Sequence, residues 1–179
     1  MEYRQKTIVP RMAWALLPLA MSSVLFGMPA DSSSLTQSEM DKIALAIPKK
    51  AAGKPLKERR VLVYSKTEAY YHDSTPAGNY ALWLMGKATG AYECEFVEDK
   101  SVFDQESLKR FDAIVFNNPC KVQCTEASQQ KAILDFVAHG KGFVGIHCAA
   151  DCFTTGRRDP KCWAPCFGAI PGGQRGPGP

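Results

Sequence analysis

The residue types best suited to chemistry lie at or just after the ends of strand-like apolar runs. They are His72, Asn117, Asn118, His147 and Asp151. Imidazole and carboxylate groups act as general acids and bases. Two histidines with a carboxylate also form a minimal ligand set for a divalent metal. Carboxamides both donate and accept hydrogen bonds, which suits hydroxyl-rich ligands such as sugars.

The histidines and asparagines among these residues also have a purely structural explanation. His72 fits an exposed loop in which Ser74 caps the following helix, and the two asparagines fit turn chemistry before a proline. His147 fits a buried histidine that is hydrogen-bonded to backbone. The third histidine, His139, suits a helix C-terminus, where a partly cationic imidazole is favourable, and we expect it to be structural.

Strand-like runs span residues 60–67, 112–118 and 142–148, and a fourth, residues 92–97, alternates well enough for another strand. Continuous apolar, β-branched runs predict buried parallel strands. Ligands of open α/β sheets bind beyond the carboxyl ends of the strands. We therefore expect these two histidines, two asparagines and Asp151 to meet at one edge of the sheet.

Helix signals separate these runs. Thr36 with Glu39 forms a capping box, and Pro48 stops that helix. Three further helices are expected. The first has Thr75 as its N-cap and ends at Gly90, the second covers residues 104–109, and the third begins at Thr125 and ends at Gly140. Alternating strands and helices imply right-handed parallel crossovers and a flavodoxin-like, doubly wound α/β sheet. After Asp151 the periodicity is lost, which leaves the last strand as a sheet edge.

Cys148 offers a competing chemistry at the turn that holds His147. A thiolate there could act as a nucleophile with a histidine base, because sharp strand-to-helix turns expose nucleophiles above α/β sheets. The chain has seven cysteines, and six of them form three C-x-x-x-C pairs. Lacking C-x-x-C spacing, they favour disulfides or buried thiols over a metal cluster. Tyr70, Tyr71 and Trp163 could form an apolar wall over a sugar-like ligand.

The N-terminus has the pattern of an export signal. Basic residues precede an apolar run over residues 12–28, and Ala30 offers a cleavage point. We expect residues 1–30 to be removed, which leaves no stable membrane span, and the protein to be periplasmic or extracellular. Residues 31–58 would be an N-terminal extension with a short helix. The net charge of +4 comes without a basic-aromatic stripe, so no nucleic-acid partner is expected.

Four stretches carry a resemblance to a known family: residues 60–67, 71–74, 108–118 and 136–151. In order and spacing they resemble the ThuA-like (trehalose-utilisation) domain. The resemblance implies a fold similar to class I glutamine amidotransferases, with a histidine-containing turn where those enzymes have their catalytic cysteine. It therefore favours His147 over Cys148. It also implies a link to trehalose-related or oxidised (keto) sugars.

Residue by residue, the resemblance carries over candidate cleft positions. These positions are His72, Ser74, Asn117, His147 and Asp151. From their residue types we expect His147, Asp151 and His72 to be catalytic residues or ligands of a divalent metal, with Asp151 orienting His147. The candidate ligand-binding residues are Tyr71, Ser74, Asn117, Asn118 and Trp163. A non-catalytic carbohydrate-binding or interaction domain and a Cys148-dependent amidase are the alternatives.

The resemblance breaks near the end of the chain. The family-like α/β domain covers residues 59–173, and Gly172-Gly173 still fits the family. Residues 174–179 form a Gly/Pro tail where relatives have a Gly-His-Pro motif. We therefore expect the domain to be truncated or frame-shifted relative to intact relatives, and this chain to be an inactive fragment.

Overall fold

The apolar runs pair as an all-parallel sheet in the computed structural model, which describes residues 27–122 and 126–152. The strands are β1 (Arg60–Tyr64), β2 (Glu93–Val97), β3 (Ala113–Asn117) and β4 (Gly142–Ile146). Their order, β2-β1-β3-β4, is that of flavodoxin-like doubly wound sheets. The predicted fold class is confirmed. Residues 1–26 of the predicted signal, Trp163 and the Gly/Pro tail lie outside the described residues.

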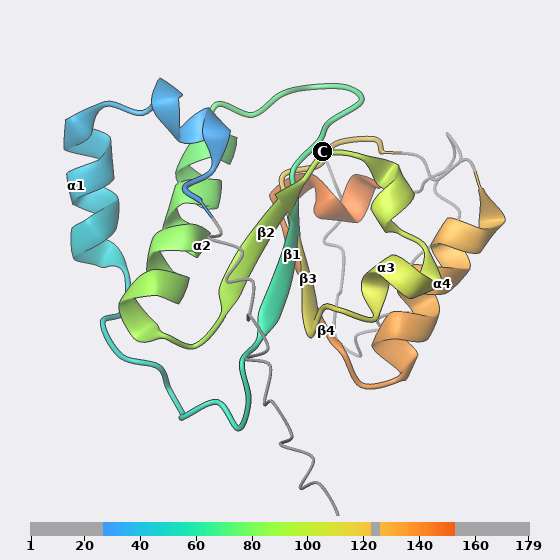
Figure 1. Ribbon diagram of the computed structural model, residues 1–179. Coiled ribbons are helices and arrows are strands. Elements are labelled where there is room, and N and C mark those ends of the chain that lie inside the picture. Colours follow the sequence, from blue (N-terminus) through green and yellow to red (C-terminus); the bar gives the residue numbers. More distant parts are fainter. Residues whose placement is uncertain (1–26, 123–125, 153–179) are drawn as a thin grey trace, which may run out of the picture.

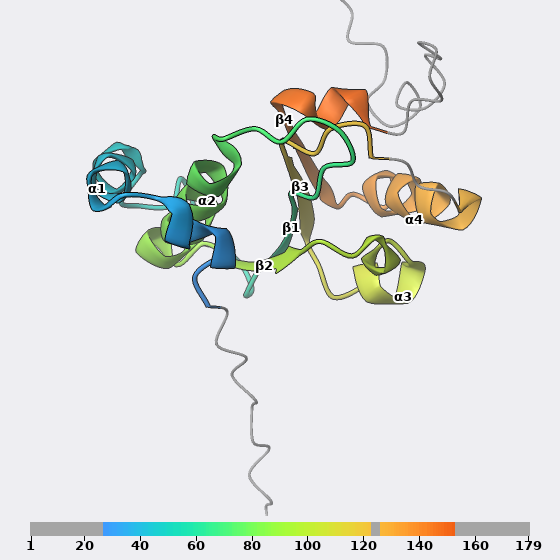
Figure 2. The ribbon, with the colours of Figure 1, turned by 90° about the horizontal axis from the view of Figure 1, so that it is seen from above.

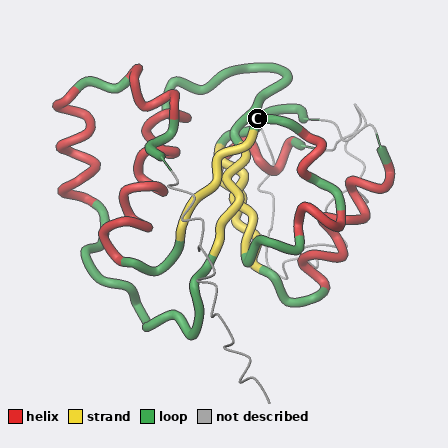
Figure 3. The backbone as a smooth tube through the Cα atoms, in the orientation of Figure 1, coloured by secondary structure: helices red, strands yellow, loops and turns green. Residues whose placement is uncertain are grey.

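Helices cover both faces of this sheet (Figure 1). Viewed from above, α1 and α2 lie on one side of the strands and α3 and α4 on the other (Figure 2). The strands form the central layer between the helices (Figure 3). The helical segments are η1 (Ala30–Ser34), α1 (Gln37–Ala46), α2 (Thr75–Thr89), η2 (Lys100–Val102), α3 (Gln105–Leu108), α4 (Ala127–Ala138) and η3 (His147–Asp151).

The core consists of two apolar clusters, because alternate residues of β1 and β3 face opposite sides of the sheet. Val61, Val63 and Val115 pack on the α2 side with Cys94 and Leu82. The cluster on the other side is rich in aromatic rings and includes Leu62, Tyr64, Phe103, Phe111, Ile114, Phe116 and Phe136. Burying such a side chain contributes roughly 1.5–3 kcal/mol. Packing in the two clusters therefore holds the strands in place. The carboxyl ends of these strands and the segments that follow them, which carry His72, Asn118 and His147, form the rim of the sheet.

The helix starts follow the sequence signals closely. The capping box at α1 is present, with the Thr36 N–H donating to Glu39 Oε2 at 2.8 Å and the Glu39 N–H donating to Thr36 Oγ1 at 3.3 Å. The predicted N-cap of α2 is wrong by one residue. Ser74 occupies the cap without a side-chain hydrogen bond, and Thr75 is the first helical residue. The chain is already turned there, because the Thr75 N–H donates to the His72 carbonyl at 2.9 Å.

The second half of the chain is more broken than the pattern indicates. The helix expected over residues 104–109 is a single turn, α3, preceded by the 3₁₀ segment η2. Asp104 caps α3 by accepting from the N–H groups of Glu106 and Ser107. His139 ends α4, with its Nδ1 lying 2.6 Å from the Asp135 carbonyl oxygen. That position is remote from the strand ends described below, in line with a structural role.

Strand β4 differs from the other strands in its exposure. It pairs with β3, and within the described residues no strand pairs with its other edge. Val144 is 49% exposed, and Gly142 and Gly145 are exposed as well. Among the described helices, none combines the length and apolar character needed to cross a bilayer.

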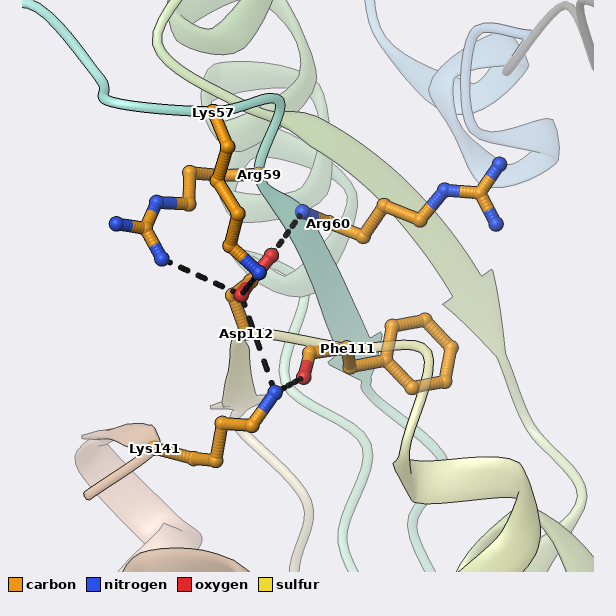
Figure 4. Close-up of polar contacts among 6 residues, drawn as sticks. All are labelled: Lys57, Arg59, Arg60, Phe111, Asp112 and Lys141. Carbon is orange, nitrogen blue, oxygen red and sulfur yellow. Dashed lines mark hydrogen bonds and ion pairs between the residues drawn. The ribbon is translucent and has the colours of Figure 1, made fainter. Parts of the chain in front are cut away.

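The amino ends of the strands carry a charged cluster around Asp112 (Figure 4). One of its carboxylate oxygens lies 2.6 Å from Lys57 Nζ, 3.3 Å from an Arg59 guanidinium nitrogen and 3.8 Å from Lys141 Nζ. The other accepts from the Arg60 N–H at 3.1 Å. Partial burial acts to raise the pKa of Asp112, but the Lys57 hydrogen bond, the backbone N–H and the nearby cations hold it down at about 2.

Candidate functional site

At the carboxyl ends of the strands, the segments after β1 and β4 bring His72, His147 and Cys148 together. The ring centroids of the two histidines are 4.5 Å apart, and the rings meet edge to face at 75°. His72 Nε2 lies 2.9 Å from Cys148 Sγ. One nitrogen or sulfur atom of each residue lies within 4.8 Å of the others. The residues are half-buried or exposed, so a small molecule can reach them.

His147 occupies a left-handed backbone position between β4 and η3, with φ of 52°. This conformation costs a residue other than glycine on the order of 1 kcal/mol, although histidine tolerates it better than most. The turn leaves the His147 side chain exposed. A strained turn that presents a reactive side chain at the end of a parallel strand is the device of α/β hydrolases. The backbone outlier therefore supports a functional role for His147.

The loop that carries His72 is tied to the loop after β3. The Glu68 N–H donates to the Cys120 carbonyl at 3.0 Å, and the Thr67 hydroxyl donates to the same oxygen at 3.2 Å. Below His72, the Thr75 N–H closes a turn onto the His72 carbonyl. These bonds anchor the loop backbone before and after His72, which helps to hold its side chain near the β4 turn.

Asn117 is buried, with 1% of its surface exposed, and lies beneath the rim. Its amide donates to the Thr75 carbonyl at 3.0 Å and to Asn79 Oδ1 at 2.8 Å. A Cβ atom at Gly78 would lie only 2.6 Å from the Asn117 amide nitrogen, so glycine allows this close approach. Asn117 thus positions α2 against β3. Its expected contact with a ligand stays a prediction.

Asn118 is 5% exposed and joins three segments of the rim. Its amide donates to Ser74 Oγ at 3.3 Å, and its backbone N–H donates to the Ile146 carbonyl at 3.3 Å. Its φ of 56° is a left-handed turn conformation that asparagine adopts readily. Turn chemistry therefore explains this asparagine, while Ser74 stays exposed at the mouth of the site.

Asp31 is a contributor that the sequence reading missed. Its carboxylate accepts from Asn79 Nδ2 at 2.8 Å, and the same amide nitrogen lies 3.1 Å from Ser65 Oγ. Because Asn79 also accepts from Asn117, the N-terminal segment η1 is linked to the end of β3. The sequence analysis placed Asp31 in an N-terminal extension, because no periodic pattern predicts a hydrogen bond between Asp31 and Asn79, which are 48 residues apart.

The aromatic residues are placed unequally. Tyr70 packs its ring against His72 with centroids 4.8 Å apart. Tyr71 is 48% exposed, and desolvation, followed by the charges of nearby carboxylates, raises its pKa. Trp163 lies outside the described residues. Asp151 is the last residue of η3, and the structure describes its backbone but not its side chain.

No disulfide involves the described cysteines, which are Cys94, Cys120, Cys148 and Cys152. Burial raises the pKa of Cys94 to about 12, so its thiol is inert near neutral pH. Cys152 is buried and donates to the Pro119 carbonyl at 3.1 Å. Cys148 is half-buried and faces an imidazole, which makes it the chemically distinct member of the set.

The sequence of the chain matches the profile of the ThuA family, described as trehalose utilisation, over residues 60–172. This match covers more than half of the chain and includes both histidines of the rim. The chain belongs to the ThuA family. No curated protein matches it at a significant level.

A ThuA-like protein of Bacteroides uniformis is similar in structure, with 22% sequence identity and a TM-score of 0.42. The alignment covers 59% of this chain and 41% of that protein. The family assignment rests on the sequence match and not on this likeness. The chain spans well under two thirds of the length of that relative.

Proposed function

We propose that this ThuA-family chain acts on a small hydroxyl-bearing molecule at the carboxyl rim, in the class of trehalose-related or oxidised (keto) sugars. The observation that carries the proposal is the contact between the His72 and His147 rings beside the left-handed turn of His147. Adjacent imidazoles can accept a proton at one atom and return it at another near neutral pH. That chemistry suits atoms next to a sugar carbonyl.

The remaining rim residues supply recognition in this proposal. Ser74, Tyr71 and Trp163 would contact the sugar, and Asp151 would orient His147. Asn117 and Asn118 would hold the rim in shape from below, as their hydrogen bonds to Thr75, Asn79 and Ser74 support. Removal of residues 1–30 would place the domain outside the cytoplasm.

The test is a turnover and calorimetric screen of the full chain with keto sugars and disaccharides. His147→Asn is the informative variant, because asparagine tolerates the left-handed backbone while removing the imidazole. We expect turnover to fall by roughly 10²–10⁴-fold, the usual worth of a general acid or base. His139→Ala, which alters the histidine at the end of α4, is the matched control and should leave turnover unchanged.

Circular dichroism of the His147→Asn variant should match that of the parent chain. Unchanged turnover in a folded variant would remove His147 from the reaction. Sugar binding without turnover by the parent chain would instead identify a carbohydrate-binding domain.

The contact of 2.9 Å between His72 Nε2 and Cys148 Sγ favours one alternative, a Cys148-dependent amidase. There the imidazole takes the thiol proton, the thiolate attacks an amide carbon, and the departing amine takes that proton. Water then hydrolyses the thioester. Alkylation of folded protein tests this pairing: Cys148 should label with iodoacetamide and Cys94 should not. A Cys148 that labels no faster than Cys94 would discard it.

A further inference from the structure

Three soft or borderline ligand atoms converge at the rim from two separate segments. His147 and Cys148 come from the turn after β4, and His72 comes from the loop after β1. Thiolate and imidazole ligands together select zinc over magnesium or calcium, which prefer oxygen. We propose that His72, His147 and Cys148 bind one Zn²⁺ ion, with no fourth ligand supplied by the side chains that the structure describes.

The spacing of the ligand atoms fits such an ion after small side-chain rotations. Zinc lies about 2.0–2.1 Å from imidazole nitrogen and about 2.3 Å from thiolate sulfur, so tetrahedral ligand atoms are roughly 3.5 Å apart. The three atoms of this site all lie within 4.8 Å of one another, and His72 Nε2 and Cys148 Sγ are 2.9 Å apart. On binding the ion, His72 Nε2 and Cys148 Sγ would move slightly apart, and the His147 ring would move towards them.

The surrounding backbone prepares the site for this ligand set. The bonds of Thr67 and Glu68 to the Cys120 carbonyl hold the His72 loop. The left-handed φ of His147 forms the turn that carries both His147 and Cys148, which are adjacent in sequence. Coordination releases the Cys148 thiol proton to solvent, and the thiolate offsets one of the two positive charges of the ion.

Three protein ligands with the fourth position taken by a small molecule would be typical of catalytic rather than structural zinc. A carbonyl or hydroxyl oxygen at that position would be polarised, which is the activation that an oxidised sugar requires. This catalytic reading rests on the proposed function, whereas zinc binding itself does not. The catalytic reading takes only the substrate class from that function, because imidazoles that bind zinc cannot also carry the proton; polarisation of the substrate oxygen by the ion would replace the proton transfer.

Calorimetry of the full chain with Zn²⁺, and absorption spectra with Co²⁺, test the site directly. We expect one equivalent to bind, with a thiolate-to-cobalt charge-transfer band that Cys148→Ser abolishes. His72→Gln, His147→Asn and Cys148→Ser should each weaken binding by more than about 100-fold, since losing even an outer-shell partner costs roughly 10–100-fold. His139→Ala and Cys94→Ala are the matched controls and should bind as the parent does.

A variant in which Cys124, Cys162 and Cys166 are all serine separates this site from other thiols of the chain. It should keep the affinity of the parent chain. Loss of binding in that variant, equal affinity in Cys148→Ser, or no binding by folded parent chain would each overturn the proposal.

The metal site and the proposed function fail in different ways. Zinc binding at these residues without turnover of any sugar would refute the proposed function and keep the metal site. Turnover that persists in a chelator, by a chain that binds no zinc, would refute the metal site alone.

Discussion

The two ends of the same parallel sheet use polar residues in opposite ways. At the amino end, the Asp112 carboxylate is matched by Lys57, Arg59 and Lys141 and by a backbone N–H. At the carboxyl end, His72 and His147 face each other on turns, and the backbone of His147 is strained. Matched charges stabilise a fold, whereas strain and accessible reactive groups are tolerated where they serve function.

Asp112→Asn should have the largest effect on stability. The variant leaves several cations at the amino end without their carboxylate, and we expect the free energy of unfolding to fall by about 2 kcal/mol. Urea denaturation measures the change. The carboxyl rim should be unaffected, with unchanged zinc affinity, and a loss of zinc binding would show that the two ends are coupled.

Acid should remove the same stabilisation from the parent chain. The folded-state pKa of Asp112, about 2, is below its unfolded value, so its contribution is present above about pH 4 and is lost as the pH falls towards 2. We expect a loss of about 1–2 kcal/mol, because the partly exposed lysines are screened by solvent. Denaturation curves of the parent and Asp112→Asn should converge over this range. Parallel curves would contradict the assignment.

Gly78→Ala tests the close packing of α2 against Asn117 at the end of β3. The new methyl group would lie 2.6 Å from the Asn117 amide and push α2 away from β3. We expect a net loss of about 1–2 kcal/mol, because overpacking outweighs the better helix propensity of alanine. Gly53→Ala is the control, since nothing lies within 4 Å of a Cβ atom there. Equal stability of the two variants would mean that the Asn117 amide can move aside without lowering the free energy of unfolding.

His147→Gly should give the smallest change, and in the opposite direction. Relief of the left-handed strain should raise the free energy of unfolding by about 0.5–1 kcal/mol, after the entropy that glycine adds to the unfolded chain. Turnover and zinc binding should be lost in the same variant. Thermal unfolding measures the gain, and a fall in stability would show that the imidazole contacts matter more than the backbone.

The strands were the most predictable part of the molecule. Apolar, β-branched runs locate β1, β3 and β4, and the alternation of strands and helices leads to their parallel order. The predicted run over residues 60–67 is longer than β1, because its polar end turns away from the sheet after Tyr64. The helix predicted over residues 104–109 is α3, which is one residue shorter at each end because Asp104 and Lys109 are its caps.

The rim was predictable only in outline. Parallel topology brings the ends of β1, β3 and β4 to one edge, so the approach of His72 to His147 follows from the fold. The contact of Cys148 with His72 and the bond from Asp31 to Asn79 depend on loop conformations that no periodic pattern encodes. The left-handed backbone of His147 is equally invisible, because it falls on histidine and not on glycine.

That left-handed turn also shapes how this protein can change by mutation. Asparagine and aspartate accept the same backbone angles, and a single nucleotide substitution converts a histidine codon into a codon for each of them. One step can therefore erase the imidazole while the bend after β4 keeps its form. If the proposed reaction takes place at this turn, a lineage with this architecture has a short genetic route to a domain that only binds its ligand, without first losing its fold.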